Sequence, residues 1–310
     1  MKIMFMGTPD FATVVLRGLC QNGLTPVCCV TVPDKPAKRG YKLTPSSVKS
    51  FALENGIDIL QPEKLSTPEF MMALEAYAPD LIVVVAYGKL LPRAVLDFPR
   101  YGCINVHGSL LPEYRGAAPM QRAIIDGKPI TGVTIMRMAE GLDTGDMILK
   151  LEAPLTEDDN FETVHDRLAE LGTEGTLRTI TALENGTAVF EKQNDALSTY
   201  AAKITKDDCI IDFNRSAQEL SSQIRGLSPF PLAFCQNGET TLKITDARAC
   251  QERPDCVVCG EVFSVSGGEI KVACGDGSLR ILGVFPESKR RMSAADYVNG
   301  GKIRVGTILK

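Results

Sequence analysis

The chain has 310 residues, of which 44% are hydrophobic and 23% charged, and its formal net charge is −4. This composition is that of a soluble globular protein, and the length favours two domains. No apolar run reaches the roughly 18–20 residues that cross a bilayer, and the apolar start is too short for a signal peptide. We therefore expect a cytoplasmic protein with no membrane partner. The acidic balance excludes a protein that simply coats nucleic acid.

The first part of the chain predicts a doubly wound α/β domain. Residues 2–6 form an apolar strand, and a periodic segment over 11–20 predicts a helix directly after it. An amphipathic stretch over 161–186 predicts a long helix. Further apolar runs predict strands at 25–32, 81–88, 102–107, 132–138 and 147–155. Strands that alternate with helices indicate a Rossmann-like, mostly parallel sheet.

The remainder of the chain changes character. Residues 187–205 have weak periodicity and predict a linker. After a short helix over 216–227, brief β-like runs separated by glycines predict a small antiparallel barrel or sandwich. Of the two, we expect a β-barrel that is OB-like. We thus expect a catalytic domain over 1–186, the linker, and a β-barrel domain over 206–310.

Proline and charge mark one segment of the first domain. Residues 33–50 hold five basic residues against the single acid Asp34, which is a local charge of +4. The prolines in this segment predict a loop, and Ser46 or Ser47 can cap a helix that runs to Glu54. A charged loop is most often only solvated, but this one stands out on an acidic chain.

One of only two histidines ends a predicted strand. His107 lies two positions after Asn105 at the carboxyl end of the strand over 102–107, so both side chains share a face. Ligands of open parallel sheets bind beyond this end of the strands. Asp143 lies in a glycine-flanked loop between two strands. An imidazole, an amide donor and a carboxylate together suit acid–base chemistry.

The type of reaction follows partly from what the sequence lacks. It holds no G-x-S-x-G elbow and no Walker A motif, and its first strand–helix turn lacks G-x-G-x-x-G. Asparagine with histidine suits stabilisation of the oxyanion in acyl transfer without a covalent enzyme intermediate. Each residue also has a structural explanation: His107 as a satisfied strand-end histidine, Asn105 as a loop anchor and Asp143 as a turn former.

Longer motifs support the catalytic interpretation of these three residues. The segments "NVHGSLLPEYRGAAPMQRAI" (105–124) and "GVTIMRMAEGLDTGDMI" (132–148) resemble the formyltransferase family that uses 10-formyltetrahydrofolate. Three further segments are similar to the branch of that family that acts on methionyl-tRNA, namely "MGTPDFA" (6–12), "PDKPAKRG" (33–40) and "VVVAYGKLLP" (83–92). The resemblance covers almost the whole chain. It departs at Phe230, where relatives often carry tryptophan.

The resemblance implies a reaction and a set of residues. Asn105, His107 and Asp143 would be the catalytic trio that moves a formyl group from 10-formyltetrahydrofolate to the α-amino group of initiator methionyl-tRNA, with no metal. The residues that would contact the folate are Ser109, Leu110, Leu111, Pro112, Ala86, Tyr87 and Gly88.

The resemblance also implies contacts to the acceptor. Phe11 would lie near the methionyl side chain, and Lys38, Arg39 and Lys42 would grip the acceptor end of the tRNA. The C-terminal barrel would assist tRNA binding, and we expect a monomer.

Several alternatives stay open. The acceptor could be a small-molecule amine, or the chain could be a non-catalytic RNA-binding module, against which the intact trio argues. Cys256 and Cys259 form a CxxC, but no second ligand pair completes a zinc site, so reduced thiols are the expectation. His165 lies between Glu162 and Asp166 and is expected to be a solvated helix residue.

Overall fold

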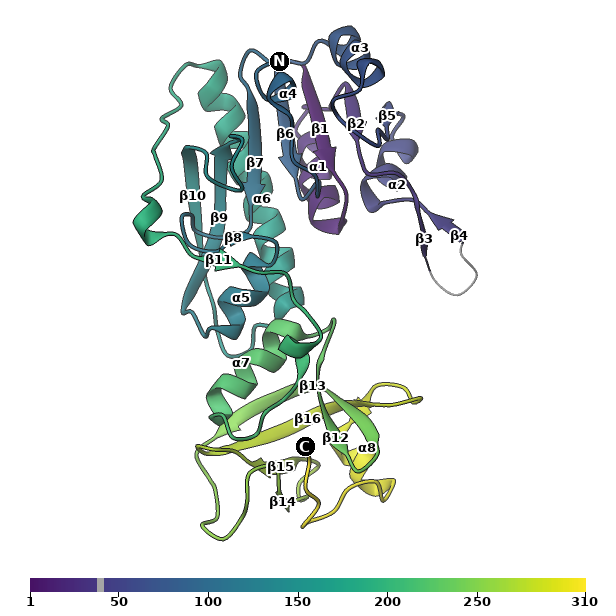
Figure 1. Cartoon of the computed structure of the whole chain (residues 1–310), viewed down its shortest axis with the longest axis vertical. Helices are drawn as coiled ribbons and strands as arrows, with labels where there is room; N and C mark the ends of the chain where they lie inside the picture. The colour runs from purple at the N-terminus through teal and green to yellow at the C-terminus, as the bar shows by residue number, and fades with distance from the viewer. Residues whose placement is uncertain (38–41) are drawn as a thin grey trace. The chain divides into compact units, whose positions relative to one another are not determined.

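A computed structural model describes residues 1–37 and 42–310 of the chain (Figure 1). The described chain forms two compact units that interleave along the sequence. The first contains residues 1–116, 130–154 and 165–201, and the second contains residues 117–129, 155–164 and 202–310. No helix in the described part of the chain is both long enough and apolar enough to cross a membrane.

A seven-stranded sheet forms the centre of the first unit, in the order β10-β9-β7-β6-β1-β2-β5. Its parallel strands are β1 (Ile3–Gly7), β2 (Cys28–Val30), β5 (Ile59–Leu60), β6 (Leu81–Val85) and β7 (Cys103–His107). Two strands at one edge, β9 (Ile130–Arg137) and β10 (Met147–Pro154), run antiparallel to their neighbours. The predicted Rossmann-like, mostly parallel sheet is confirmed.

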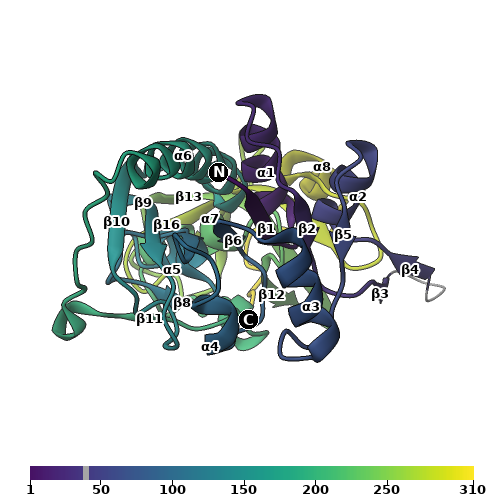
Figure 2. The same ribbon diagram turned by 90° about the horizontal axis from the view of Figure 1, so that it is seen from above.

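Helices cover both faces of this sheet (Figure 2). One face carries α1 (Asp10–Gln21), α2 (Ser47–Glu54) and, from residue 165 on, α6 (Phe161–Glu184); the other carries α3 (Pro68–Tyr77) and α4 (Arg93–Leu96). Every residue of β1 and β6 is buried, which explains why these strands are continuously apolar.

Two segments predicted to be irregular contain short regular elements. The proline-rich loop contains β3 (Lys35–Ala37) paired antiparallel with β4 (Lys42–Thr44). Pro36 lies opposite Leu43 in this ribbon. Within sheets proline is confined mainly to edge strands, and both strands of a two-stranded ribbon are edges. Ser46 caps α2 as predicted, because its side chain accepts a hydrogen bond from the Lys49 N–H.

The stretch predicted as a linker also holds regular structure. It contains the short helix η1 (Asp195–Leu197) and β11 (Tyr200–Ala201), which pairs in parallel with β8 (Arg115–Gly116). A two-residue strand has no periodicity to read, since distant pairing alone defines it. Residues 187–201 therefore belong to the first unit.

The second unit is built on an antiparallel sheet whose strands follow the order β12-β13-β16-β15-β14. These strands are β12 (Ala233–Asn237), β13 (Thr240–Cys250), β14 (Val262–Ser264), β15 (Ile270–Ala273) and β16 (Ser278–Pro286), with β17 (Met292–Ser293) paired to β16. Ile308 bridges Glu261 and Leu309 bridges Asn237, so the last residues link the two ends of the sheet. The predicted antiparallel β-barrel class is confirmed.

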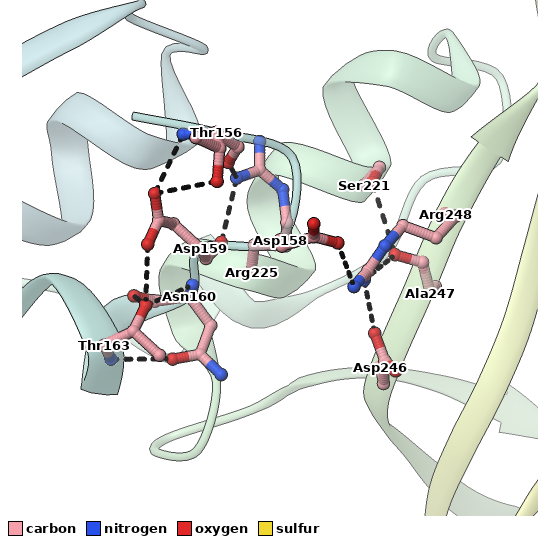
Figure 3. Close-up of polar contacts among 10 residues, drawn as sticks. All are labelled: Thr156, Asp158, Asp159, Asn160, Thr163, Ser221, Arg225, Asp246, Ala247 and Arg248. Atoms are coloured by element: carbon pink, nitrogen blue, oxygen red, sulfur yellow. Dashed lines mark hydrogen bonds and ion pairs between the residues drawn. The ribbon is translucent and has the colours of Figure 1, made fainter. Parts of the chain in front are cut away.

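The second unit also contains α5 (Pro119–Ile125), the short 3-10 helix η2 (Asp207–Cys209), α7 (Ala217–Leu227) and α8 (Ala294–Asn299). Arg225 of α7 is 8% exposed, and its Nη1 donates to the carbonyl oxygens of Thr156 and Asp159, each at 2.9 Å (Figure 3). The Asp159 carboxylate in turn accepts from the Thr156 N–H and from the Thr163 hydroxyl. This network joins residues 155–164 to α7 inside the unit.

Candidate active site

Asn105 and His107 lie at the carboxyl end of β7, which is an internal strand of the sheet. It pairs with β6 on one side and β9 on the other, so it is held along its length. A Cβ on Gly172 of α6 would lie 2.9 Å from Val106 Cγ1, which shows how closely that helix packs on the strand. Since Val106 faces α6, Asn105 and His107 point to the opposite face.

The surroundings of His107 determine which of its two ring nitrogens carries the hydrogen. The residue is 5% exposed, and its Nε2 lies 2.9 Å from the carbonyl oxygen of Tyr114. A carbonyl oxygen can only accept, so Nε2 carries a hydrogen in either charge state. Nδ1 is therefore the nitrogen that can take up or release a proton, and it lies 3.7 Å from Asp143 Oδ2.

Asp143 reaches the histidine from the loop between β9 and β10. Its side chain is 13% exposed, and Oδ2 also accepts a hydrogen bond from the Gly116 N–H at 2.9 Å. Its backbone is left-handed, with φ of 52°, a conformation that costs energy in a residue with a side chain. The same loop needs glycine at 145, where a Cβ would lie 1.7 Å from the Arg137 carbonyl oxygen. The structure thus brings His107 and Asp143 together from distant segments.

Asn105 is half-buried, and its side-chain amide makes no hydrogen bond with any described residue. Both amide N–H groups are therefore available to a ligand on the same face of β7 as His107. Structure and sequence agree here, because the i, i+2 spacing predicted a shared face.

The turn after β7 is pinned to the neighbouring strand. Thr134 of β9 donates its hydroxyl to the Ser109 carbonyl oxygen at 2.7 Å and accepts from the Leu111 N–H at 3.0 Å. Ser109 and Leu111 are buried, whereas Leu110 and Pro112 keep partial exposure. Within this turn, the last two residues are joined by a cis peptide bond.

The segment after β6 lies at the same edge of the sheet, because β6 and β7 are parallel neighbours. Ala86 and Gly88 both have left-handed backbones, and a Cβ on Gly88 would meet nothing within 4 Å. Tyr87 is 2% exposed, and its hydroxyl is buried without a hydrogen-bond partner among the described residues. Burial raises the pKa of Tyr87 to about 12, so the hydroxyl stays a donor.

The expected acceptor contacts fall in two places. Phe11 is the second residue of α1 and is 5% exposed, with its ring edge-on to His165 at a centroid distance of 5.5 Å. Lys38 and Arg39 lie outside the described residues, and Lys42 belongs to β4. These contacts stay predictions.

Sequence reasoning missed the residues that surround the pair. The Tyr114 carbonyl and the Gly116 N–H hold His107 and Asp143, and both are main-chain groups that no side-chain pattern reveals. The Tyr114 N–H donates to the Thr199 hydroxyl at 2.8 Å. The one signal in the sequence is "YRG" (114–116), which lies inside the segment 105–124 that resembles the family.

The cysteines do not build a recognisable site. All ten are free thiols, with Cys256 exposed and Cys259 half-buried. Burial raises the pKa of the thiols of Cys28, Cys103, Cys235 and Cys274 to about 12, so they stay protonated and unreactive. Across residues 1–37 and 42–310, no group of three or more His, Cys, Asp or Glu side chains is arranged to hold a metal ion.

Two family models match the chain. The model described as "Formyl transferase" matches residues 1–180, and the one described as "Formyl transferase, C-terminal domain" matches residues 203–302. The chain belongs to the formyl transferase family, which confirms the resemblance found in its motifs.

Several relatives that match this chain over its full length are methionyl-tRNA formyltransferases. That of Citrifermentans bemidjiense is 45% identical over 309 residues, which cover 100% of this chain and 96% of the relative. Those of Desulfotalea psychrophila and Caldanaerobacter subterraneus are 46% and 45% identical; the matches cover 100% of this chain and 96% and 100% of those relatives.

Solved structures show the same fold. The N-formyltransferase of Helicobacter canadensis, in complex with folinic acid and dTDP-3-aminofucose, has a TM-score of 0.67 at 20% identity and covers 91% of this chain and 98% of that one. A methionyl-tRNA formyltransferase from Clostridium thermocellum has a TM-score of 0.58 at 18% identity, with 82% and 95% covered.

Proposed function

We propose that this chain transfers the formyl group of 10-formyltetrahydrofolate to the α-amino group of methionyl-tRNA, with the initiator tRNA as its acceptor. The observation that carries the proposal is the identity of about 45% to methionyl-tRNA formyltransferases over the whole chain. Since these relatives are bacterial and initiation takes place in the cytoplasm, the proposal places the enzyme there.

The donor fits the chemistry of the edge where β6 and β7 end. When bound, 10-formyltetrahydrofolate supplies the formyl group as an activated amide. Ala86–Gly88 and Ser109–Pro112 would hold it. The space beside Gly88 supports this assignment, because a Cβ there would meet nothing within 4 Å.

Asn105 stabilises charge in this proposal. Attack on a carbonyl carbon moves negative charge onto its oxygen, and a donor already in place lowers the barrier. The Asn105 amide has two N–H groups free for this purpose. A single such donor contributes about 10²–10³-fold in other acyl transfers.

His107 moves the proton. An α-amine with a pKa of about 7.7–8.0 must be neutral to attack, and it loses a proton as the new N–C bond forms. His107 Nδ1 takes that proton, directly or through one water, while Asp143 opposite it stabilises the imidazolium. As the old C–N bond breaks, the same nitrogen returns the proton to the leaving amine.

The basic segment provides the contact to RNA. Lys38, Arg39 and Lys42 bind phosphates of the acceptor end, so their contribution weakens as salt rises. Phe11 contributes to the methionyl side-chain site.

A formylation assay tests the proposal. The enzyme receives 10-formyltetrahydrofolate with charged initiator tRNA, and in parallel with elongator methionyl-tRNA, glycinamide ribonucleotide or a nucleotide-linked amino sugar. Formylation of the initiator at the highest kcat/KM is expected. Transfer only to a small amine would contradict the tRNA assignment, and equal use of both tRNAs would contradict the initiator preference.

A further inference from the structure

Residues 187–201 pair with chain segments next to both members of the proposed catalytic pair. Glu191 forms an antiparallel bridge to Met147, with two main-chain hydrogen bonds of 2.8 Å. Farther along, β11 pairs with β8, which immediately follows Tyr114. The segment is thereby tied to the strand after the Asp143 loop and to the strand beside His107. Gln193 lies between these two attachment points.

All hydrogen-bonding groups of the Gln193 side chain are used. Its Nε2 donates to the carbonyl oxygens of Asp143 and Gly145, both at 2.8 Å. Its Oε1 accepts from Arg115 Nε at 3.0 Å and from Arg115 Nη2 at 2.8 Å. Because carbonyls only accept and a guanidinium only donates, the amide can take just one orientation.

These contacts close a ring around Asp143. Arg115 holds Gln193, Gln193 holds the Asp143 main chain, and the Asp143 carboxylate accepts from the N–H of Gly116, the residue next to Arg115. We call Asp143, Gly116, Arg115 and Gln193 the positioning ring. It fixes both the main chain and the side chain of a residue whose left-handed backbone is unfavourable by itself.

We propose that Gln193 and Arg115 are positioning residues that hold the Asp143 carboxylate opposite His107 Nδ1. The proposal rests on the proposed function of the His107–Asp143 pair. Gln193 acts on the loop rather than on substrate, since all its polar atoms are already paired. Without it, two loop carbonyls lose their donor, and the loop loses the contact that holds Asp143 in its left-handed conformation.

Two substitutions test the Gln193 and Arg115 side chains of the positioning ring separately. Gln193→Glu keeps the size of the side chain and its pairing with Arg115, but it turns a carboxylate toward two carbonyl oxygens. Arg115→Lys keeps the charge and removes the two-pronged contact. Glu191→Gln serves as the matched control, because that side chain is exposed on the same segment. We expect kcat to fall about 10²-fold in Gln193→Glu, since small displacements of catalytic groups have effects of that size.

The KM values separate positioning from stability. Gln193→Glu should keep its KM values for methionyl-tRNA and the folate within about 3-fold, as loss of interactions made only in the transition state requires. A merely structural role would lower the melting temperature and leave kcat of the folded enzyme unchanged. Wild-type kcat in folded Gln193→Glu and Arg115→Lys proteins would overturn the proposal.

A double-mutant cycle with Asp143→Asn completes the test. If Gln193 acts through Asp143, adding Gln193→Glu to Asp143→Asn costs less than 3-fold further. Losses that multiply would show that Gln193 acts elsewhere. Full activity of Asp143→Asn alone would instead remove the proposed role of the catalytic pair, so the two failures are distinguishable.

Discussion

The two histidines of the chain sit beside carboxylates in opposite settings. His107 Nδ1 lies 3.7 Å from Asp143, with side chains 6% and 13% exposed. On α6, His165 Nδ1 lies only 2.9 Å from Asp166, with side chains 21% and 71% exposed. The shorter contact is therefore the more solvated one.

This difference shows that distance alone does not mark a site. An exposed ion pair is weak because water screens it, and its typical contribution is about 0–1 kcal/mol. A pair shielded from water acts on a nearby reaction far more strongly. His107 also has a fixed tautomer and an adjacent free amide at Asn105, whereas His165 packs its ring on Phe11.

The largest expected effect comes from the shielded pair itself. His107→Ala should lower kcat about 10⁴-fold, because general acid–base catalysis contributes up to that amount. Adding Asp143→Asn to it should cost little more, since the two groups act as a unit. Steady-state kcat of both singles and the double variant checks this, with filter binding of methionyl-tRNA as the control for a folded enzyme.

Loss of the free amide should rank next. Asn105→Asp keeps the shape of the side chain and removes its N–H donors, so kcat should fall about 10²–10³-fold. The KM values should change little, because the donor acts on developing charge. A large rise in the folate KM with kcat unchanged would instead assign Asn105 to donor binding.

These predictions concern site residues that could be identified from the sequence. The apolar runs and the i, i+2 spacing placed Asn105 and His107 correctly on one face of β7. The positioning ring could not be predicted, because β8 and β11 contain two residues each and their pairing links distant segments. The Tyr114 carbonyl that fixes the His107 tautomer could not be predicted either, because every residue has a main-chain carbonyl and the sequence does not mark this one.

A smaller effect is expected at the basic segment. Arg39→Ala should raise the KM for methionyl-tRNA about 10-fold at low salt and leave the folate KM unchanged. The slope of log KM against log salt concentration should also fall by about 1, which is the contribution of one phosphate contact. Measuring KM over a salt series checks both features, and an equal rise in both KM values would argue against an RNA contact.

The smallest effect on kcat should come from the more solvated histidine. His165→Ala should leave kcat within about 2-fold of the wild type, because its ion pair with Asp166 is screened by water and contributes little. Its melting temperature should fall slightly, as the contact with Phe11 is lost. A 100-fold loss of kcat would place His165 in the reaction and end the contrast with His107.

The most direct measurement is the single-turnover rate constant of formyl transfer in His107→Ala and in His165→Ala. Both enzymes are saturated with 10-formyltetrahydrofolate and initiator methionyl-tRNA, so binding differences drop out. The proposed roles predict a rate in His107→Ala that is about 10⁴-fold lower than in His165→Ala. Rates that agree within 10-fold would contradict the assignment of proton transfer to His107.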